Sequence, residues 1–254
     1  KPLGSVADVF INADGVKKSI TAPGPGNYIT MAKSVALAKS ILGEESVQQR
    51  SFVLAHGSST PQNRVTESLI YHRLAETFDI NNWPVAAPKA YVGHTIAPAS
   101  GDQITMALGI FAHNIMPGIT TINSVADDVY NERLNIALDH WQCEAMDVAF
   151  INSKGFGGNN ATATLLSPDV TLSMMEKRYS IGEMASYKEK LASVEAKQKV
   201  YQEKADNGQF ELIYKFGVGV LGDDDIQINT ENISMTGFTN PIELPSDNPF
   251  EDMT

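Results

Sequence analysis

The chain of 254 residues contains a single cysteine, Cys143, and this scarcity excludes several classes of protein. One thiol cannot close an internal disulfide, and no CxxC pair is present to bind zinc or to act as a redox couple. The first ten residues, KPLGSVADVF, also lack the charged, apolar and small-residue regions of a secretory signal peptide. We therefore expect a protein of the reducing cytoplasm.

Long hydrophobic runs are also missing. The stretch 106–115, MALGIFAHNI, is among the longest, and it falls well short of the roughly 20 residues that cross a bilayer as a helix. With 43% hydrophobic residues, the chain still has ample material for a packed core. The sequence therefore predicts an ordinary globular chain with no membrane span.

Positive charge is scarce, because 19 Lys and Arg residues face 30 Asp and Glu residues and leave a formal net charge of −11. Non-specific binding to nucleic acid needs clustered Lys and Arg, so a nucleic-acid partner is not expected. No Lys or Arg follows Lys215, whereas eight of the 30 acidic residues do. Most of the net charge therefore belongs to the C-terminal tail, and the rest of the chain is close to balanced.

Strands and helices alternate over the first two thirds of the chain. Apolar and β-branched residues predict strands at 7–12, 51–56, 146–152 and 160–166, and apolar side chains at helical spacing predict helices at 29–42, 65–78 and 101–114. The pattern predicts a layered α/β domain over residues 1–167 with a largely parallel or mixed sheet.

A second unit is predicted over residues 168–254. The stretch 171–206 has high helix propensity with a break at Gly182, and 209–220 has the composition of a strand or hairpin. The polar end beyond 239 is expected to be extended or partly disordered. The long helix could be a solvated excursion, but its recurring apolar side chains favour an appendage that packs on something.

Three short motifs lie where predicted strands end. They are HGSST at 56–60, KAYVGH at 89–94 and SKGFGGNN at 153–160. Loops that follow strands gather the ligands of α/β folds, histidine can donate or accept protons near neutral pH, and glycine lets a backbone approach a ligand closely. Each motif by itself is weak evidence, because a buried histidine or a glycine turn is more often structural.

Together, the order and spacing of these motifs resemble the C-terminal half of a β-ketoacyl-acyl carrier protein synthase, the condensing enzyme of fatty acid synthesis. The resemblance covers about residues 5–166 and includes PGITTIN at 117–123, which is similar to a family loop between the second and third motifs. It implies a thiolase-like fold, here the C-terminal half, followed by a helical and β appendage at 168–254. It also implies that no metal and no organic cofactor is needed.

The resemblance assigns the catalytic groups. His56 and His94 would lie beside the reacting thioester, and Lys89 would pair with Glu67 below the site and help to orient the histidines. Phe156 would be a gate residue, with a backbone N–H that contributes to an oxyanion hole.

The resemblance also assigns substrate-binding positions. The hydroxyls of Ser58 and Thr60 would hold the pantetheine arm, and Gly157 and Gly158 would let the backbone turn approach the substrate.

The chain departs from the family pattern at several positions. Arg64 stands where the family usually has an aspartate, and Lys154 replaces a phenylalanine. A glutamate expected in the helix after His94 is here Ile104, which predicts that a local hydrogen-bond partner is missing.

The implied reaction needs partners. An N-terminal ketosynthase half would carry the nucleophilic cysteine, and acyl carrier protein would deliver malonyl groups for decarboxylative Claisen condensation. The complete enzyme is expected to be a homodimer. Cys143 belongs to none of the motifs, and we expect a buried, inert thiol.

Other functions stay open from the residues alone. The changes at Arg64 and Lys154 are compatible with a noncatalytic chain-length-factor subunit, and a polyketide ketosynthase would show the same motifs. A thiolase is disfavoured, because its second cysteine frame, C-x-G, is absent. A catalytic metal is disfavoured by the 38 positions between His56 and His94 and by the lack of a convincing third ligand.

Overall fold

The computed structural model of the protein describes residues 1–17, 23–58, 60–209 and 211–253. The chain forms two compact units, Lys1–Leu191 and Ala192–Thr254. Helix α7, Ile181–Asp206, contributes to both units. Within the described ranges, no helix combines the length and the apolar content that a membrane span requires. The predicted domain boundary between residues 167 and 168 stays a prediction.

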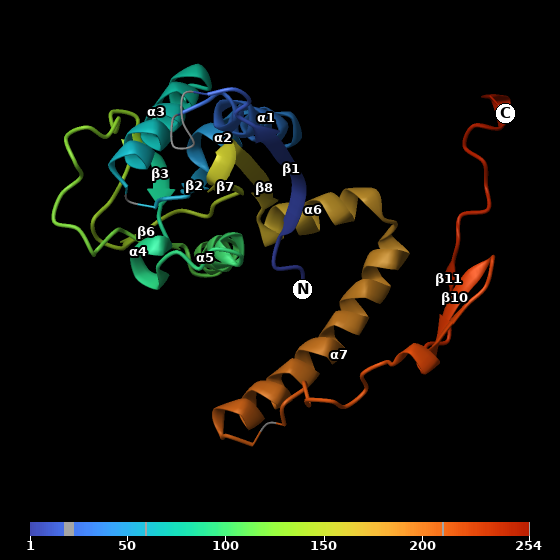
Figure 1. Ribbon diagram of the computed structural model, residues 1–254. Coiled ribbons are helices and arrows are strands. Elements are labelled where there is room, and N and C mark those ends of the chain that lie inside the picture. The colour runs from blue at the N-terminus through green and yellow to red at the C-terminus, as the bar shows by residue number, and fades with distance from the viewer. Residues whose placement is uncertain (18–22, 59, 210, 254) are drawn as a thin grey trace. The chain divides into compact units, whose positions relative to one another are not determined.

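A six-stranded mixed sheet lies at the centre of the first unit, with strand order β1-β8-β7-β2-β3-β5 (Figure 1). Its strands are β1 Ser5–Ala13, β2 Ser51–Leu54, β3 Trp83–Ala86, β5 Leu134–Asn135, β7 Val148–Gly155 and β8 Asn159–Leu166. The strands β7, β2, β3 and β5 run parallel, and β8 and β1 add antiparallel partners. A separate antiparallel pair joins β4 Ile115–Met116 to β6 Trp141–Gln142.

Helices cover both faces of this sheet, as Figure 1 shows. They are α1 Gly26–Leu42, α2 Glu44–Gln49, α3 Pro61–Thr77, α4 Lys89–Val92, α5 Ala99–His113 and α6 Pro168–Arg178. Because side chains alternate along a strand, Val53 packs with α1 and α3 in one core cluster, whereas its neighbour Leu54 packs with α5 in the other. The predicted layered α/β architecture with a mixed sheet is confirmed.

The long helical stretch is broken earlier than the sequence predicts. Helix α6 ends at Arg178, and α7 begins at Ile181, so Gly182 lies inside the first turn of α7 rather than at the break. The Ser180 hydroxyl accepts from the Glu183 N–H at 3.3 Å, and the Glu183 carboxylate accepts from the Ser180 N–H at 2.8 Å. This reciprocal capping box starts a new helix at Ser180, which explains why the break precedes the glycine.

The second unit contains the end of α7 and a small antiparallel sheet of order β11-β10-β9. Its strands are β9 Ile226–Ile228, β10 Asn232–Met235 and β11 Ile242–Glu243, with single 3-10 turns at Asp223–Asp225 and Glu251–Met253. None of the described residues between 192 and 253 is buried, so this unit has no core of its own.

The strand or hairpin predicted at 209–220 is wrong for the residues that the structure describes, and Phe210 lies outside them. Gly217 and Gly219 both have positive φ, and the Val218 N–H donates to the Lys215 carbonyl at 3.1 Å. Turns of this kind interrupt the extended backbone that a strand needs.

The two units predict different effects of truncation. A protein truncated after residue 167, and otherwise unchanged, should have a melting temperature of the first unit that is lower by about 4 °C or more. The reason is that α6 contributes the buried residue Thr171 and packs Val170 against the core. The Thr171 hydroxyl also hydrogen-bonds Ser5 at 2.8 Å. Ending the chain after residue 206 should change this temperature much less. Calorimetry measures both truncated proteins, and the same melting temperature for the two would contradict the assignment of α6 to the first unit.

Candidate active site

The three sequence motifs meet at one edge of the sheet. His56 follows the end of β2, His94 follows β3 and the short helix α4, and the glycine turn follows β7. Because β2, β3 and β7 are parallel neighbours, their carboxyl ends lie at the same edge. The His56 and His94 rings are 5.3 Å apart between centroids and stand nearly perpendicular at 82°. The predicted pair of histidines is therefore brought together.

A cavity of about 230 Å³ opens beside this pair, and Ser100 and Ser153 also line it. His56 is 8% exposed, whereas His94 is exposed at the rim. The arrangement gives the cavity one imidazole in a dry environment and one close to solvent.

Backbone hydrogen bonds hold both imidazoles in the same protonation pattern. The Lys154 N–H donates to Nδ1 of His56 at 3.3 Å, and the Ile96 N–H donates to Nδ1 of His94 at 3.1 Å. A neutral imidazole that accepts at Nδ1 carries its proton on Nε2. Each histidine can therefore donate a hydrogen bond from Nε2.

Burial lowers the pKa of His56 to about 4. The negative charge of Glu67 opposes this shift, and the positive charges of Lys89 and Lys154 add to it. Desolvation disfavours the charged imidazolium, so the shift keeps His56 neutral at physiological pH.

The side chain of Glu67 binds the backbone at His56 and Gly57. Its buried carboxylate accepts from the His56 N–H at 2.7 Å, the Gly57 N–H at 3.0 Å, Asn63 Nδ2 at 2.8 Å, Asn152 Nδ2 at 2.8 Å and the Tyr71 hydroxyl. Burial by itself raises the pKa of Glu67, but the hydrogen bonds from Tyr71 and Gly57 and the nearby positive charges bring this pKa below its usual value. Glu67 is therefore an ionised acceptor.

Lys89 does not form the predicted ion pair with Glu67. Its buried Nζ has no hydrogen-bond partner among the described residues, and the Glu67 oxygens are already filled by nearer donors. Burial lowers the pKa of Lys89, while the carboxylates of Glu67 and Asp102 oppose that shift. Lys89 therefore acts on the site through its charge at a distance, not through direct contact.

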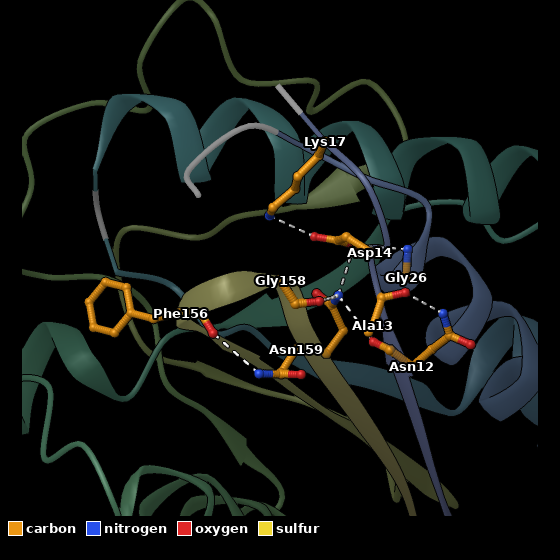
Figure 2. A network of polar contacts seen from close by, with 9 residues as sticks. Asn12, Ala13, Asp14, Lys17, Gly26, Phe156, Gly158 and Asn159 are labelled. Carbon is orange, nitrogen blue, oxygen red and sulfur yellow. Dashed lines mark hydrogen bonds and ion pairs between the residues drawn. The ribbon is translucent and has the colours of Figure 1, made fainter. Parts of the chain in front are cut away.

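The glycine turn is supported by a buried aspartate that the sequence analysis missed. Figure 2 shows Asp14 in a network with Lys17 and the N-terminus of α1, where its carboxylate accepts from Lys17 Nζ and from the Gly26 N–H, both at 2.9 Å. Asn160 Nδ2 donates to Asp14 at 2.9 Å and to the Gly158 carbonyl at the same distance. A polar residue directly after a strand was the available signal for Asp14.

Phe156, Gly157 and Gly158 of the turn differ in backbone conformation and exposure. Gly157 and Gly158 have φ of 81° and 87°, in the region that favours glycine. The Phe156 ring points away from Asp14 in Figure 2 and is 93% exposed. The roles of Phe156, Gly157 and Gly158 toward a substrate stay predictions.

The hydroxyls of Ser58 and Thr60 lie at the start of α3, on the solvent side. Their oxygens are 3.5 Å apart, and Thr60 immediately precedes Pro61, the first residue of the helix. Their substrate-binding role stays a prediction.

Of the two charge changes, Arg64 lies at the surface and Lys154 lines the cavity. Arg64 forms a paired contact with Asp128 at 2.8 and 2.9 Å on the surface. Lys154 follows Ser153 on β7 and lines the cavity, and because side chains alternate along a strand, its side chain shares a face with Asn152.

Cys143 is buried in the core cluster on the α5 side. Burial raises the pKa of its thiol. The expectation of a buried thiol is confirmed, and a thiol of this kind is a poor nucleophile.

Comparisons with known proteins place these features in a family context. Residues 3–123 match the family model described as the C-terminal domain of β-ketoacyl synthases. The chain is 51% identical over 251 residues to the β-ketoacyl-[acyl-carrier-protein] synthase FabY of Pseudomonas aeruginosa, which covers 98% of this chain and 40% of the relative. It is 30% identical over 155 residues to 3-oxoacyl-[acyl-carrier-protein] synthase 2 of Synechocystis, covering 56% of this chain and 33% of the relative.

Solved structures agree with these relatives. The crystal structure of the noncanonical ketosynthase FabY from P. aeruginosa matches 99% of this chain with a TM-score of 0.90 at 49% identity, and the match spans 40% of that chain. A ketosynthase from module 6 of the bacillaene synthase of Bacillus subtilis matches 65% of this chain and 31% of its own with a TM-score of 0.56 at 22% identity, which speaks for the fold alone. The chain thus spans less than half the length of these proteins.

The low pKa of His56 predicts a pH dependence of stability. An unfolded histidine titrates near pH 6.5, so between about pH 4 and 6.5 the unfolded chain binds more protons than the folded one. The stability that this neutral histidine contributes is fully present above about pH 6.5 and is lost as the pH falls toward 4. Nuclear magnetic resonance of the His56 imidazole should show a midpoint near pH 4, and a midpoint above pH 6 would contradict the assigned burial effect.

The glycine turn gives a matched pair of substitutions. A Cβ on Gly158 would lie 2.8 Å from Asp14 Oδ2, whereas a Cβ on Gly157 would meet, among the described residues, only Asn159 Nδ2 at 4.0 Å. Both alanine variants carry the cost of positive φ, about 1 kcal/mol, but Gly158→Ala should lose about 1–3 kcal/mol more in unfolding free energy. Urea unfolding measures both variants, and equal losses would show that the Asp14 network can move aside.

Proposed function

Since the chain belongs to the β-ketoacyl synthase family and has its thiolase-like fold, we propose that it supplies the histidine-bearing part of a 3-oxoacyl-acyl carrier protein synthase. The complete enzyme joins an acyl thioester to malonyl-acyl carrier protein by decarboxylative Claisen condensation in fatty acid biosynthesis. This chain is an acyltransferase component that needs the N-terminal ketosynthase half.

One observation carries the proposal. The imidazoles of His56 and His94 stand 5.3 Å apart beside a cavity, and each accepts a backbone N–H at Nδ1, which leaves Nε2 as the position that can donate. Paired neutral donors suit an oxygen that gains negative charge during reaction, because they stabilise it without first losing a proton.

The first step needs a thiolate that this chain does not offer. An acyl group moves from its thioester to a cysteine of the N-terminal half, and the original thiol leaves with the proton. Cys143 is unsuited to this role, since it is buried in the core and its pKa is raised.

The second step uses the histidines. The bond between the malonyl carboxylate and the adjacent carbon breaks, carbon dioxide leaves, and the electron pair stays as an enolate whose oxygen accepts from Nε2–H of His56 and His94. The enolate carbon then attacks the acyl-cysteine carbonyl, and the cysteine thiolate leaves as the 3-oxoacyl product forms. The low pKa of His56 keeps this donor neutral throughout the physiological pH range.

Other motif residues serve the same reaction. The Phe156 backbone N–H joins that of the nucleophilic cysteine as an oxyanion hole for the acyl carbonyl, while its exposed ring gates entry. Gly157 and Gly158 give the turn its close approach, and Ser58 and Thr60 hold the pantetheine arm. Lys89 and Glu67 set the electrostatics and orientation of the histidines.

A noncatalytic chain-length-factor role is less well supported. The two changes that suggested it leave the histidine pair in place, because Arg64 is paired with Asp128 at the surface and the Lys154 N–H donates to Nδ1 of His56. The groups that line the cavity, His56 and His94, are those that condensation requires.

The proposed function implies binding partners and a cellular location. Acyl carrier protein delivers malonyl groups, the complete enzyme acts as a homodimer in the cytoplasm, and no cofactor takes part. A polyketide pathway would use the same site, so acyl-chain assays with purified carrier protein decide between the two pathways.

Histidine variants of the complete enzyme test this function. His56→Ala and His94→Ala should each reduce malonyl decarboxylation about 100-fold or more, because each removes a preorganised donor to the enolate oxygen. Acylation of the N-terminal cysteine should fall much less, since that step does not form the enolate. Product formation and covalent acyl labelling measure the two steps separately.

His113→Ala is the matched control, because His113 is exposed in the last turn of α5 and lies away from the cavity. It should keep both steps near their normal rates. Near-normal decarboxylation by either cavity variant would remove that histidine from the mechanism, and the absence of both steps in the unmodified enzyme would refute the proposed function.

A further inference from the structure

One glutamine inside the first unit joins the strands that carry the site. Gln103 lies on α5 and is fully buried. Its Nε2 lies 2.9 Å from each of three backbone carbonyl oxygens, those of Leu54, Ala55 and Asn152. The next residue is Ile104, where the family pattern has a glutamate, and the loss of that partner stays a prediction.

These contacts lie where the ladder between β2 and β7 ends. The last registered pair of the two parallel strands is Leu54 with Ile151, and His56 and Ser153, each two residues further along its segment, line the cavity. Gln103 therefore holds carbonyl groups of both strands at the point of separation. The side-chain amide nitrogen of Gln103 carries two hydrogens, so the three carbonyl oxygens share these two donors.

The other end of the same amide reaches the cavity wall. Oε1 of Gln103 accepts from the Ser153 hydroxyl at 3.2 Å, and Ser153 is 2.8 Å from Ser100 Oγ on the same helix. Both serines line the cavity beside His56. One buried side chain thus connects α5, the end of β2, β7 and the cavity wall.

The connection bears directly on His56. Ala55 immediately precedes this histidine, and Asn152 lies two residues before Lys154, whose N–H donates to His56 Nδ1 at 3.3 Å. The distance between the two backbone segments therefore determines whether that hydrogen bond forms. Without the bond, no other hydrogen bond among the residues that the structure describes reserves Nδ1 of His56 as the acceptor, and the proton can occupy either ring nitrogen.

We propose that Gln103 is a positioning residue that holds the ends of β2 and β7 at the separation at which His56 accepts at Nδ1 and presents Nε2–H to the cavity. Its consequence for catalysis rests on the proposed condensation reaction, whereas its consequence for the tautomer of His56 does not. Misplacing a hydrogen-bond donor by about 1 Å is enough to lower the reaction rate of a preorganised site strongly.

Gln103→Met in the complete enzyme is the direct test, because methionine has a similar length and no N–H donor. We expect decarboxylation of malonyl thioester to fall about 10-fold or more, with a much smaller change in cysteine acylation. Nitrogen-15 resonance of labelled histidine, assigned against His56→Ala, should change from one dominated by the Nε2–H tautomer to a mixture. This spectroscopic change would not follow from a general loss of stability.

Gln48→Met is the matched control. Gln48 donates a single hydrogen bond, from Nε2 to the Phe78 carbonyl at 3.3 Å, at a partly buried place away from the cavity. This variant should keep the His56 tautomer and both reaction rates. A folded Gln103→Met enzyme with an unchanged tautomer would overturn the inference, whatever its activity.

Gln103→Glu keeps the test decisive where the methionine variant fails to fold. A protonated carboxyl can donate to one carbonyl, but an ionised one would face three carbonyl oxygens, so burial and repulsion favour the protonated form. Decarboxylation by this variant should therefore decline as the pH rises, more steeply than in the unmodified enzyme. Identical pH profiles would overturn the inference, whereas an unmodified enzyme that never decarboxylates malonyl thioester would count against the proposed function alone.

Discussion

The Glu67 carboxylate accepts hydrogen bonds from five groups while it is only 3% exposed, and the geometry of the histidine site depends on this interaction. A buried carboxylate is costly unless donors surround it, and removing one partner of such a group typically costs about 1–3 kcal/mol. The donors come from the end of β2, from α3 and from β7, so the charge is accommodated only when all three are in place. This requirement ties the backbone of His56 to the folded core.

One face of the sheet carries the hydrogen-bond network that supports the site, and the other face borders the cavity. On the α1 and α3 face, Asn152 Nδ2 donates to Asn27 Oδ1 at 3.2 Å, and Asn27 Nδ2 donates to Asn152 Oδ1 at 2.6 Å, beside the ionised Glu67. On the α5 face, Ser153 borders the cavity and Gln103 fills the gap between the strands. Because successive residues of a strand point to opposite faces, one segment of β7 serves both the supporting network and the cavity.

The glycine turn is held by a third buried network, around Asp14. This carboxylate joins the end of β1, the start of α1 and the region of the turn through Gly26 and Asn160. Glycine is required at Gly158 for two separate reasons, a positive φ and the absence of space beside Asp14. The site is thus assembled from strand ends, and the buried side chains of Glu67, Gln103 and Asp14 hold those of β1, β2 and β7.

Local pattern was enough to predict much of this arrangement. The strand that ends at His56, the helices that became α1, α3 and α5, and the return strand β8 all follow from apolar spacing and turn residues, because these signals lie within short stretches of chain. The break before α7 lies ahead of Gly182 because the capping box of Ser180 and Glu183, which is also a local signal, starts the helix there. The described part of 209–220 forms no strand, because strand composition without a partner strand does not make a sheet.

By itself, the sequence determined the order of the elements, the mixed α/β sheet and the pairing of His56 with His94, since parallel strands bring their carboxyl ends to one edge. Only the tertiary structure decided which groups contact the Glu67 carboxylate and that Lys89 is not one of them. It also decided that Gln103 closes the gap between β2 and β7. The contact of Glu67 with Asn152 joins residues 85 positions apart and that of Gln103 with Leu54 joins residues 49 apart, and such distances depend on how helices pack on the sheet, which no local pattern of residue types specifies.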